Sequence, residues 1–583
     1  MQEERKTLLS LRDVVVKFRV RGRILTAIRG VSLDIYENES IAIVGESGSG
    51  KSVLTKTFAG MLDSNGYVDS GEIILDDKEL QDTVVRKNKV ALAIIDILKK
   101  RLNYSSKLEF GSNTYKKILE LKAERAEKIS LSYEEKQSIE DKIQDLKFDK
   151  TELFNLKQTL DPKKEKDKIA ETNQKMAELS LQIKDLENKE ANIIAEKKKA
   201  LAEDTEYNEN YNAKMLELKE QYKKDISQEI SEKTIARNER IAKEIYLSIG
   251  RYGFRKRVKF AFQFVHAMRK AMRLGVDLDN EEELNKIFDT VAFRVAYLDE
   301  TEDRIHGYCN LDLAKIKYSK DWQQIRGTRV ATIFQDPMTS LNPIITIGKQ
   351  ITSIIIKHQK CSESEAKRRA IDLMKKVGIP NAEKRFDDYP FQYSGGMRQR
   401  IVIAIALSCQ PKILICDEPT TALDVTIQAQ ILKLIKDLQK EFGYTIVFIT
   451  HDLGVVANIA ERVAVLYAGQ IVELGTCEEV FQDPRHPYTW ALLSSLPQLS
   501  ERGKELYSIS GTPPSLYNKI VGDPFAPRNP YCLKIDTIQD SPMFKVSDTH
   551  YAKTWLLDPR APKVEKPEII QNIHEKLVKV FNI

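Results

Sequence analysis

The sequence predicts an α/β fold, and three observations lead to that prediction. Runs rich in β-branched residues at 14–18 and 40–44, and a similar run at 71–77, are typical of strands. A glycine-rich loop follows the second run directly and precedes a helical pattern. Far downstream, an apolar run at 413–416 ends in two carboxylates, at the position where open parallel sheets bind their ligands.

Length and charge limit the classes of protein to consider. The chain has 583 residues, more than one hydrophobic core usually serves, so we expect several domains. Its 92 basic and 86 acidic side chains leave a net charge of only +6, which does not indicate nucleic-acid binding. The sequence has no apolar run near the ~18 residues that span a bilayer, and no signal-peptide core at its start. We therefore expect a cytoplasmic protein whose membrane role depends on partners.

Composition divides the chain into four segments. Residues 1–81 and 316–499 have the mixed texture of a globular α/β domain. Residues 82–315, between them, are dominated by Lys and Glu and almost lack Gly and Pro, which predicts a mainly helical segment. Residues 500–583 are rich in proline and turn signals, which predicts a loop-rich extension.

Part of the middle segment has the spacing of a coiled coil. Apolar residues recur at intervals of three and four on both sides of a break at Asp161 and Pro162. They are Ile139, Ile143, Leu146, Leu153 and Leu160 before the break, and Ile169, Met176, Leu179, Ile183, Leu186 and Ile193 after it. We expect an antiparallel helical hairpin; highly charged disorder is the alternative that the composition leaves open.

A second helical pattern at 251–274 combines many basic residues with aromatic and aliphatic ones. A basic amphipathic helix of this kind suits an anionic membrane surface or a nucleic acid. The alternative is that its apolar side packs on a neighbouring helix while its charges stay in water.

The glycine-rich loop is the first candidate site. Gly45, Gly50, Lys51 and Ser52 fit the phosphate-loop pattern G-x-x-x-x-G-K-[ST]. In such a loop the backbone N–H groups face phosphate oxygens, the lysine reaches the β and γ phosphates, and the hydroxyl is placed for Mg²⁺. We predict that the whole loop binds a nucleotide, and it comprises Gly45, Glu46, Ser47, Gly48, Ser49, Gly50, Lys51 and Ser52.

Polar residues after three later strand-like runs complete the candidate site. We predict that Asp417 binds the metal and that Glu418 is the general base that activates water. His451 is placed to contact the γ-phosphate, and Gln335 to bind Mg²⁺ or the attacking water. Each signal is weak alone, since a histidine after a strand is usually structural. Their order along the chain is the stronger signal.

Phe18 lies in a strand-like run upstream of the phosphate loop. An aromatic ring at this position can stack on an adenine base. Packing in the core explains the same residue equally well.

This ordered set resembles the ATP-binding subunits of ABC transporters. By that resemblance, Lys51 belongs to the Walker A loop, Gln335 to the Q-loop and His451 to the switch region, while Asp417 and Glu418 form Walker B with its catalytic glutamate. The resemblance implies ATP and Mg²⁺ as cofactors.

Two further stretches match the same family. Ser394, Gly395 and Gly396 fit its signature motif, with Tyr393 where leucine is usual. The D-loop is matched by Ala422, Leu423 and Asp424. In this family the signature of one subunit caps ATP held by the Walker A loop of another, so the resemblance implies a dimer.

The resemblance narrows at residues 334–343, 417–428 and 485–493, which are similar to OppD-type subunits of the oligopeptide, dipeptide and nickel import subfamily. It implies an ABC-type nucleotide-binding domain of the P-loop NTPase class, with a RecA-like core, an antiparallel β subdomain and a helical subdomain. In this chain the helical, partly coiled-coil segment interrupts that domain.

The same resemblance implies a function and a location. An OppD-type subunit is an ATPase at the cytoplasmic face of the cell membrane that energises import of oligopeptides. The implied partners are a second ABC ATPase, expected to be a distinct OppF-type sibling, two transmembrane permease subunits and an extracellular substrate-binding protein. No nucleic acid is expected.

One departure from the subfamily concerns a metal cluster. OppD-type tails often carry four cysteines that bind an iron–sulfur cluster. The corresponding positions here are Asp523, Asn529, Asp536 and Thr554, and Cys532 fills none of them. We therefore expect no iron–sulfur cluster.

Three alternatives stay open. The transported solute of such a subunit can be a dipeptide or nickel. An ATPase of the chromosome-maintenance (SMC) type also splits its ATPase head with a coiled coil, but there the coil follows the Q-loop, while here Gln335 follows the insertion. Residues 82–315 are also compatible with a module that binds another protein or the membrane surface.

Overall fold

The structure, a computed structural model, describes residues 5–21, 23–132, 136–139, 141–143, 145–147, 149–150, 153, 165–250, 252–288, 291, 293–316, 319–421, 423–496, 509–517, 520–567 and 570. The chain divides into two compact units. The first comprises residues 1–83, 289–296 and 308–583, and the second comprises residues 84–288 and 297–307.

The main sheet of the first unit has, in its described part, eight strands in the order β13-β14-β12-β11-β3-β10-β9-β8. Strands β11, β3, β10, β9 and β8 are parallel, while β12, β14 and β13 continue the sheet in antiparallel fashion. The bounds are β3 Ser40–Val44, β8 Val330–Ile333, β9 Ile413–Asp417, β10 Thr445–Thr450, β11 Arg462–Tyr467, β12 Gln470–Thr476, β13 Phe544–Lys545 and β14 Tyr551–Ala552. Nearly all residues of the parallel strands are buried, which explains their continuous apolar runs.

A second sheet in the first unit is antiparallel, in the order β2-β1-β4. Its strands are β1 Thr7–Val20, β2 Arg23–Tyr36 and β4 Gly66–Leu75. Apolar residues of β1 and β2, such as Val14, Val16 and Ile28, are buried. This sheet is the antiparallel subdomain that the sequence led us to expect.

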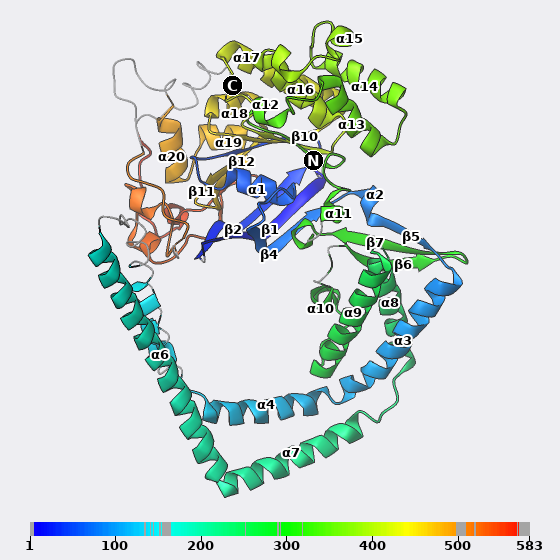
Figure 1. Cartoon of the computed structure of the whole chain (residues 1–583), viewed down its shortest axis with the longest axis vertical. Coiled ribbons are helices and arrows are strands. Elements are labelled where there is room, and N and C mark those ends of the chain that lie inside the picture. The colour runs from blue at the N-terminus through cyan, green and yellow to red at the C-terminus, as the bar shows by residue number, and fades with distance from the viewer. Residues whose placement is uncertain are drawn as a thin grey trace. The chain divides into compact units, whose positions relative to one another are not determined.

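Helices complete the first unit, and α13, α14, α15 and α16 gather next to one another (Figure 1). Apolar residues such as Ile351, Ala370 and Ile403 are fully buried in this group. The helices are α1 Lys51–Phe58, α2 Lys78–Gln81, α11 Ser319–Trp322, α12 Pro337–Ser340, α13 Ile347–Gln359, α14 Glu363–Lys376, α15 Ala382–Arg385, α16 Gly395–Leu407, α17 Val425–Phe442, α18 Leu453–Ile459, α19 Cys477–Gln482 and α20 Pro487–Ser494.

The second unit is built of long helices. In the described part of the unit they are α3 Lys89–Phe110, α4 Ser112–Ile129, α6 Lys166–Glu203, α7 Thr205–Asp225, α8 Glu232–Ile249 and α9 Phe254–Leu274, followed by the short α10 Glu281–Ile287. Helices α3, α8 and α9 pack on one another, and α4 runs beside α7 (Figure 1). Fully buried Asn238 of α8 donates through its Nδ2 to Asn103 Oδ1 (2.9 Å) and Ser106 Oγ (2.8 Å) of α3, so this interface includes a polar contact between the two helices.

The basic helical pattern forms α9. Phe260, Phe264 and Met268 are buried, with the Phe264 ring 4.8 Å from that of Phe288. On the same helix, the exposed fractions of Phe254 (81%) and Phe262 (57%) stay high. One apolar face of α9 therefore packs inside the second unit, while other aromatic residues face water.

The apolar stripe predicted for a coiled coil lies partly on α6. Ile183 is buried, and Ile169, Met176, Leu179, Leu186 and Ile193 are half-buried. The break at Asp161 and Pro162 and the preceding Leu160 lie outside the described residues. The coiled coil therefore stays a prediction.

Three strands in the middle segment were not anticipated. They are β5 Asp82–Arg86, β6 Phe293–Glu300 and β7 Arg304–Leu311, in the order β5-β7-β6. Strand β5 is largely exposed, and β7 alternates buried residues with exposed or half-buried ones, so neither has a continuous apolar run. The part of the chain that the structure describes contains no helix that is both long and apolar enough to cross a membrane.

Candidate active site

The candidate site residues lie at one edge of the main sheet because their strands are parallel. Gly45 follows β3, Glu418 follows β9 and His451 follows β10 directly, and Gln335 comes two residues after β8. Residue pairing fixes this alignment: Val44 lies opposite Thr450, and Asp417 lies opposite Ile449. The carboxyl ends of the strands thus meet at one edge, as in other open α/β sheets that bind ligands there.

The phosphate loop requires glycine for steric reasons. A Cβ on Gly45 would lie 2.2 Å from the carbonyl oxygen of Leu466, and Gly48 and Gly50 have φ values of 80° and 104°. Lys51 is buried, and its Nζ donates to the carbonyl oxygens of Gly45 (2.8 Å) and Glu46 (2.9 Å). Burial lowers the pKa of Lys51, against the opposing effect of nearby carboxylates.

Ser52 and Asp417 meet across the sheet edge. Ser52 Oγ donates to Asp417 Oδ1 at 3.1 Å. Burial raises the pKa of the Asp417 carboxyl, while the Ser52 hydrogen bond acts in the opposite direction. Both residues supply hard oxygen donors of the kind that Mg²⁺ prefers. Among the residues that the structure describes, no three His, Cys, Asp or Glu side chains cluster as a ready metal site.

The Glu418 carboxylate lies at the centre of a hydrogen-bonded cluster. Its Oε2 accepts from Gln335 Nε2 (2.8 Å) and from Thr421 Oγ1 (3.2 Å), and its Oε1 lies 3.1 Å from His451 Nδ1. Three of these residues were predicted from the sequence, and the structure brings them together. Thr421 was missed, because a threonine three residues after the acid carries no signal of its own.

Other predicted residues lie apart from this cluster. Phe18 is in strand β1 of the antiparallel sheet. Its ring lies against Gly66, because a Cβ on Gly66 would be only 2.6 Å from Phe18 Cε1. Ser394 caps α16 by accepting from Met397 N (3.4 Å), and Asp424 caps α17 by accepting from Ile427 N (3.0 Å).

The other residues of the predicted signature motif and D-loop differ in their surroundings. Gly395 is exposed, and a Cβ on Gly396 would lie 2.8 Å from Ile427 Cγ2. Tyr393, at the usual leucine position, is buried and donates its hydroxyl to Arg385 O (2.7 Å). Ala422 lies outside the described residues.

Two residues that touch the phosphate loop were not predicted. Tyr488 OH accepts from the N–H of Glu46 (2.8 Å), and Arg528 binds the Glu46 carboxylate through two nitrogens. Both lie more than 400 positions further along the chain, and neither belongs to a phosphate-loop pattern. Only the fold reveals their proximity.

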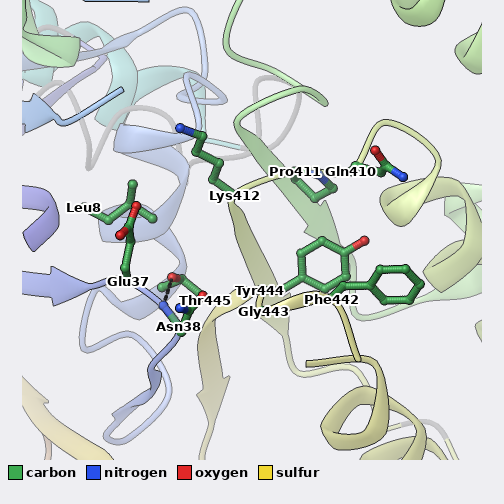
Figure 2. Close-up of a pocket in the computed structure, with 10 residues that line it drawn as sticks. All are labelled: Leu8, Glu37, Asn38, Gln410, Pro411, Lys412, Phe442, Gly443, Tyr444 and Thr445. Carbon is green, nitrogen blue, oxygen red and sulfur yellow. Dashed lines mark hydrogen bonds between the residues drawn. The ribbon is translucent and has the colours of Figure 1, made fainter. Parts of the chain in front are cut away.

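A pocket of about 450 Å³ lies at the opposite edge of the main sheet (Figure 2). It is lined by Leu8, Glu37, Asn38, Gln410, Pro411, Lys412, Phe442, Gly443, Tyr444 and Thr445. Asn38 N donates to Thr445 Oγ1 (2.8 Å), and Lys412 pairs with Asp77 (3.2 Å). Because β9 and β10 begin at this pocket and end at the phosphate loop, the pocket is separate from the candidate active site.

Comparison with known proteins gives the family. The family model described as "ABC transporter" matches residues 28–269 and 295–421, more than half of the chain. The model described as "Oligopeptide/dipeptide transporter, C-terminal region" matches residues 472–535.

Three relatives illustrate the similarity. The chain is 66% identical over 270 residues to the oligopeptide transport ATP-binding protein AmiE of Streptococcus pneumoniae. The matched residues cover 46% of this chain and 76% of that relative. The chain is 61% identical over 263 residues to the oligopeptide transport ATP-binding protein OppD of Bacillus subtilis (45% and 74%), and 60% identical over 246 residues to the dipeptide transport ATP-binding protein DppD of Lactococcus lactis (42% and 70%). The chain therefore belongs to the ABC transporter family, as an ATP-binding subunit that couples ATP hydrolysis to transport.

Proposed function

We propose that this chain energises the import of oligopeptides across the cell membrane through transmembrane partner subunits. The match of residues 472–535 to the C-terminal region of oligopeptide and dipeptide transporters carries this proposal. The relatives named as oligopeptide transport proteins, at 61–66% identity, support the same solute class.

In this proposal the phosphate loop holds ATP and Glu418 activates the attacking water. Glu418 accepts from Gln335 and adjoins His451, so both neighbours are in place to orient it and to sense the γ-phosphate. Phe18 stacks on the adenine. These roles rest on position and chemistry.

Ser52, Asp417 and Gln335 are the residues that we assign to Mg²⁺. The 3.1 Å contact between Ser52 Oγ and Asp417 Oδ1 fits two donors of one octahedral shell. When bound, the ion neutralises charge on the β and γ phosphates. Lys51 contributes a further positive charge at the same phosphates.

We propose that four residues of this chain contact ATP held by a second ATPase subunit. They are Ser394, Gly395, Gly396 and Asp424. Ser394, Gly395 and Asp424 are exposed in this chain, so they are free to reach ATP held by a partner. ATP binding then closes the two subunits, and hydrolysis releases them. We propose a distinct sibling as the second ATPase, two permease subunits in the membrane, an extracellular substrate-binding protein, and a location at the cytoplasmic membrane face.

The domain boundaries at residues 81, 315 and 499 belong to the same proposal. They place an insertion at 82–315 within one nucleotide-binding domain and a transporter-type extension at 500–583. The insertion then acts as a surface module that binds a protein or the membrane.

We further propose that the C-terminal extension holds no iron–sulfur cluster. The side chains at the four cysteine positions of the subfamily accept backbone hydrogen bonds instead. Asp523 accepts from Phe525 N (2.9 Å), Asn529 from Tyr531 N (2.9 Å), Asp536 from Leu533 N (2.6 Å) and Thr554 from Leu556 N (3.3 Å). Each side chain thus fixes a local turn of the extension. Iron and acid-labile sulfide in the purified protein, at stoichiometric levels, would contradict this.

The experiment that tests the transport proposal uses the whole complex in lipid vesicles. ATP-dependent uptake of a labelled oligopeptide is expected, with uptake lost when Glu418→Gln replaces the wild-type chain. Uptake of nickel or only of dipeptides would redirect the proposal within the subfamily. ATPase stimulation by DNA, without membrane partners, would favour the SMC-type alternative.

A further inference from the structure

Glu46, the second residue of the phosphate loop, is held by a residue of the C-terminal region. Arg528 Nη1 donates to Glu46 Oε2 (2.7 Å), and Arg528 Nη2 donates to Glu46 Oε1 (3.1 Å). Two parallel N–H···O bonds of this kind fix both distance and orientation. The bond joins residues 482 positions apart, so it ties the loop to a separate part of the chain.

Arg528 is itself locked in place. Its Nε donates to Ser510 O (3.0 Å), its Nη1 also lies 3.2 Å from Tyr467 OH, and its side chain is only 4% exposed. The hydrogen bonds to Glu46 raise the pKa of Arg528 above its ordinary value, so the guanidinium stays charged. A buried and immobile cation can position the loop, whereas a mobile surface arginine cannot.

The backbone of Glu46 is also fully engaged. Its N–H donates to Tyr488 OH (2.8 Å), and its carbonyl oxygen accepts from Lys51 Nζ (2.9 Å). Tyr488 is fully buried, with its ring 4.5 Å from Tyr467 and 5.4 Å from Phe525. Glu46 therefore links the C-terminal region on one side to the phosphate-binding lysine on the other.

We propose that Arg528 is a positioning residue for ATP binding, through which the C-terminal region sets the shape of the phosphate loop. The loop contains Gly45, Gly48 and Gly50, which leave its backbone free to adopt many conformations. The Arg528–Glu46 contact removes part of that freedom before the nucleotide arrives. Because a preorganised loop loses less entropy on binding, the contact increases nucleotide affinity.

The test measures the affinity of the full chain for fluorescent Mg-ADP, together with KM and kcat for ATP and the melting temperature. Arg528→Ala is expected to weaken ADP binding and raise KM on the order of tenfold, as for a typical coupling between sites, with a smaller change in kcat. The ADP affinity of Arg528→Lys should lie between those of the wild type and Arg528→Ala, since the ammonium group retains the charge and one hydrogen bond. Glu46→Gln, which keeps one oxygen acceptor but loses the charge and the second hydrogen bond, should weaken binding less than Arg528→Ala, and the double variant should lose little more than Arg528→Ala alone.

The matched control is Arg462→Ala. Arg462 forms a buried pair with Glu39 in the same unit (3.1 Å), at the start of β11, away from the phosphate loop. It should lower the melting temperature and leave the ADP affinity unchanged. The proposal fails if Glu46→Gln and Arg528→Ala bind ADP like the wild type. It also fails if their effects add fully in the double variant, or if Arg462→Ala weakens ADP binding as much.

If Arg528→Ala does not fold, Glu46→Gln and Tyr488→Phe still decide the question. The second variant keeps the aromatic ring and removes the acceptor of the Glu46 N–H. Because these measurements follow nucleotide binding directly, they do not depend on which solute is transported.

Discussion

Glu418 combines an unusual backbone with a crowded carboxylate. Its φ of 45° lies in the left-handed region, which costs free energy for a residue with a Cβ. Its N–H donates to Ile449 O at 3.0 Å, so β10 holds this conformation in place. The strained turn aims the carboxylate at Gln335 and His451 rather than along the strand direction.

Glu418→Gln is expected to reduce kcat by about 10²–10⁴-fold while ATP binding persists, since an amide cannot accept the proton of the attacking water. The amide oxygen still accepts from Gln335, so the geometry should survive. Phosphate release in a single turnover, together with bound nucleotide after gel filtration, measures both effects. Glu441→Gln, a change of an exposed carboxylate on α17, is the control and should keep its activity. Rapid hydrolysis by Glu418→Gln would mean that another group is the base.

Asp523 should make stability depend on pH. Burial raises its pKa to about 6 in the folded protein, from a value of about 3.9 in the unfolded chain. The folded state therefore binds more protons between these two pH values, and ionisation above about pH 6 disfavours folding. The difference of about two units corresponds to at most about 3 kcal/mol.

Asp523→Asn removes this ionisation while keeping an oxygen that accepts from Phe525 N. The variant should be more stable than the wild type at pH 8, and the difference should shrink below pH 6 and vanish near pH 4. Urea unfolding at several pH values measures it. Asp548→Asn, a change at an exposed carboxylate paired with Lys545, should show no such gain at high pH. If the stability gained by Asp523→Asn stays constant from pH 4 to pH 8, ionisation of Asp523 is not the cause of that gain.

The limits of sequence reasoning are visible at this scale. Gln335, Glu418 and His451 were predictable because each follows an apolar run, and parallel strands bring such positions to one edge. Arg528 and Tyr488 were not, because their importance depends on a contact with Glu46 that no local pattern encodes. The same holds for Thr421, whose hydroxyl matters only because of where Glu418 turns.

At the scale of elements, helix α9 has some apolar residues that are buried and others that are exposed to water. The ring of Phe264 is buried against Phe288, whereas Phe254 at the start of the helix is 81% exposed. The residue pattern predicted a basic amphipathic helix that either binds an anionic surface or packs on a neighbouring helix. Which aromatic residues pack depended on α3 and α8, which lie elsewhere in the chain.

Phe264→Ala should destabilise the second unit by about 3–5 kcal/mol, since it leaves a cavity in a packed interface. Phe254→Ala, its matched control, should change stability by less than about 0.5 kcal/mol. Denaturation followed by circular dichroism compares the two, because the second unit is mainly helical. KM for ATP should be unaffected by both, since the phosphate loop and Glu418 lie in the first unit. Equal destabilisation by the two variants would contradict the assigned packing.

Strand order was predictable only in part. The apolar runs at 40–44 and 413–416 identified buried strands, and both occur as β3 and β9. The placement of β10 between them was not predictable, because pairing between distant strands leaves no trace in a single sequence. Strands β5, β6 and β7 were not predicted because lysine and glutamate dominate the surrounding segment.

At the scale of the molecule, the candidate site lies in one compact unit although its parts are far apart in the sequence. Lys51 and Gln335 lie on either side of the second unit in the chain, yet both belong to the first. The helical segment thus interrupts the sequence of the ATPase domain without separating its functional residues. Because the candidate site residues of this chain all lie in the first unit, hydrolysis should tolerate changes confined to the second.

This independence can be tested by removing α4 to α7, residues 112–225. Gly111 and Ile226 are already neighbours, because a Cβ on Gly111 would lie 3.0 Å from Ile226 Cγ2. A linker of about four residues can join them, a usual length between helices, and α3, α8, α9 and α10 remain to pack on one another. In the assembled complex we expect ATP hydrolysis by the shortened chain within about threefold of the wild type, as for changes that do not couple to the site.

Melting temperature and ADP affinity are measured in parallel, and peptide uptake is followed separately. A shortened chain that folds and binds ADP but hydrolyses no ATP would disprove the independence of the two units. It would then place a residue needed for hydrolysis within 112–225, although the carboxylate, amide and imidazole of the site all lie outside it. Retained hydrolysis with lost uptake would instead assign the removed helices to the coupling between ATPase and transport.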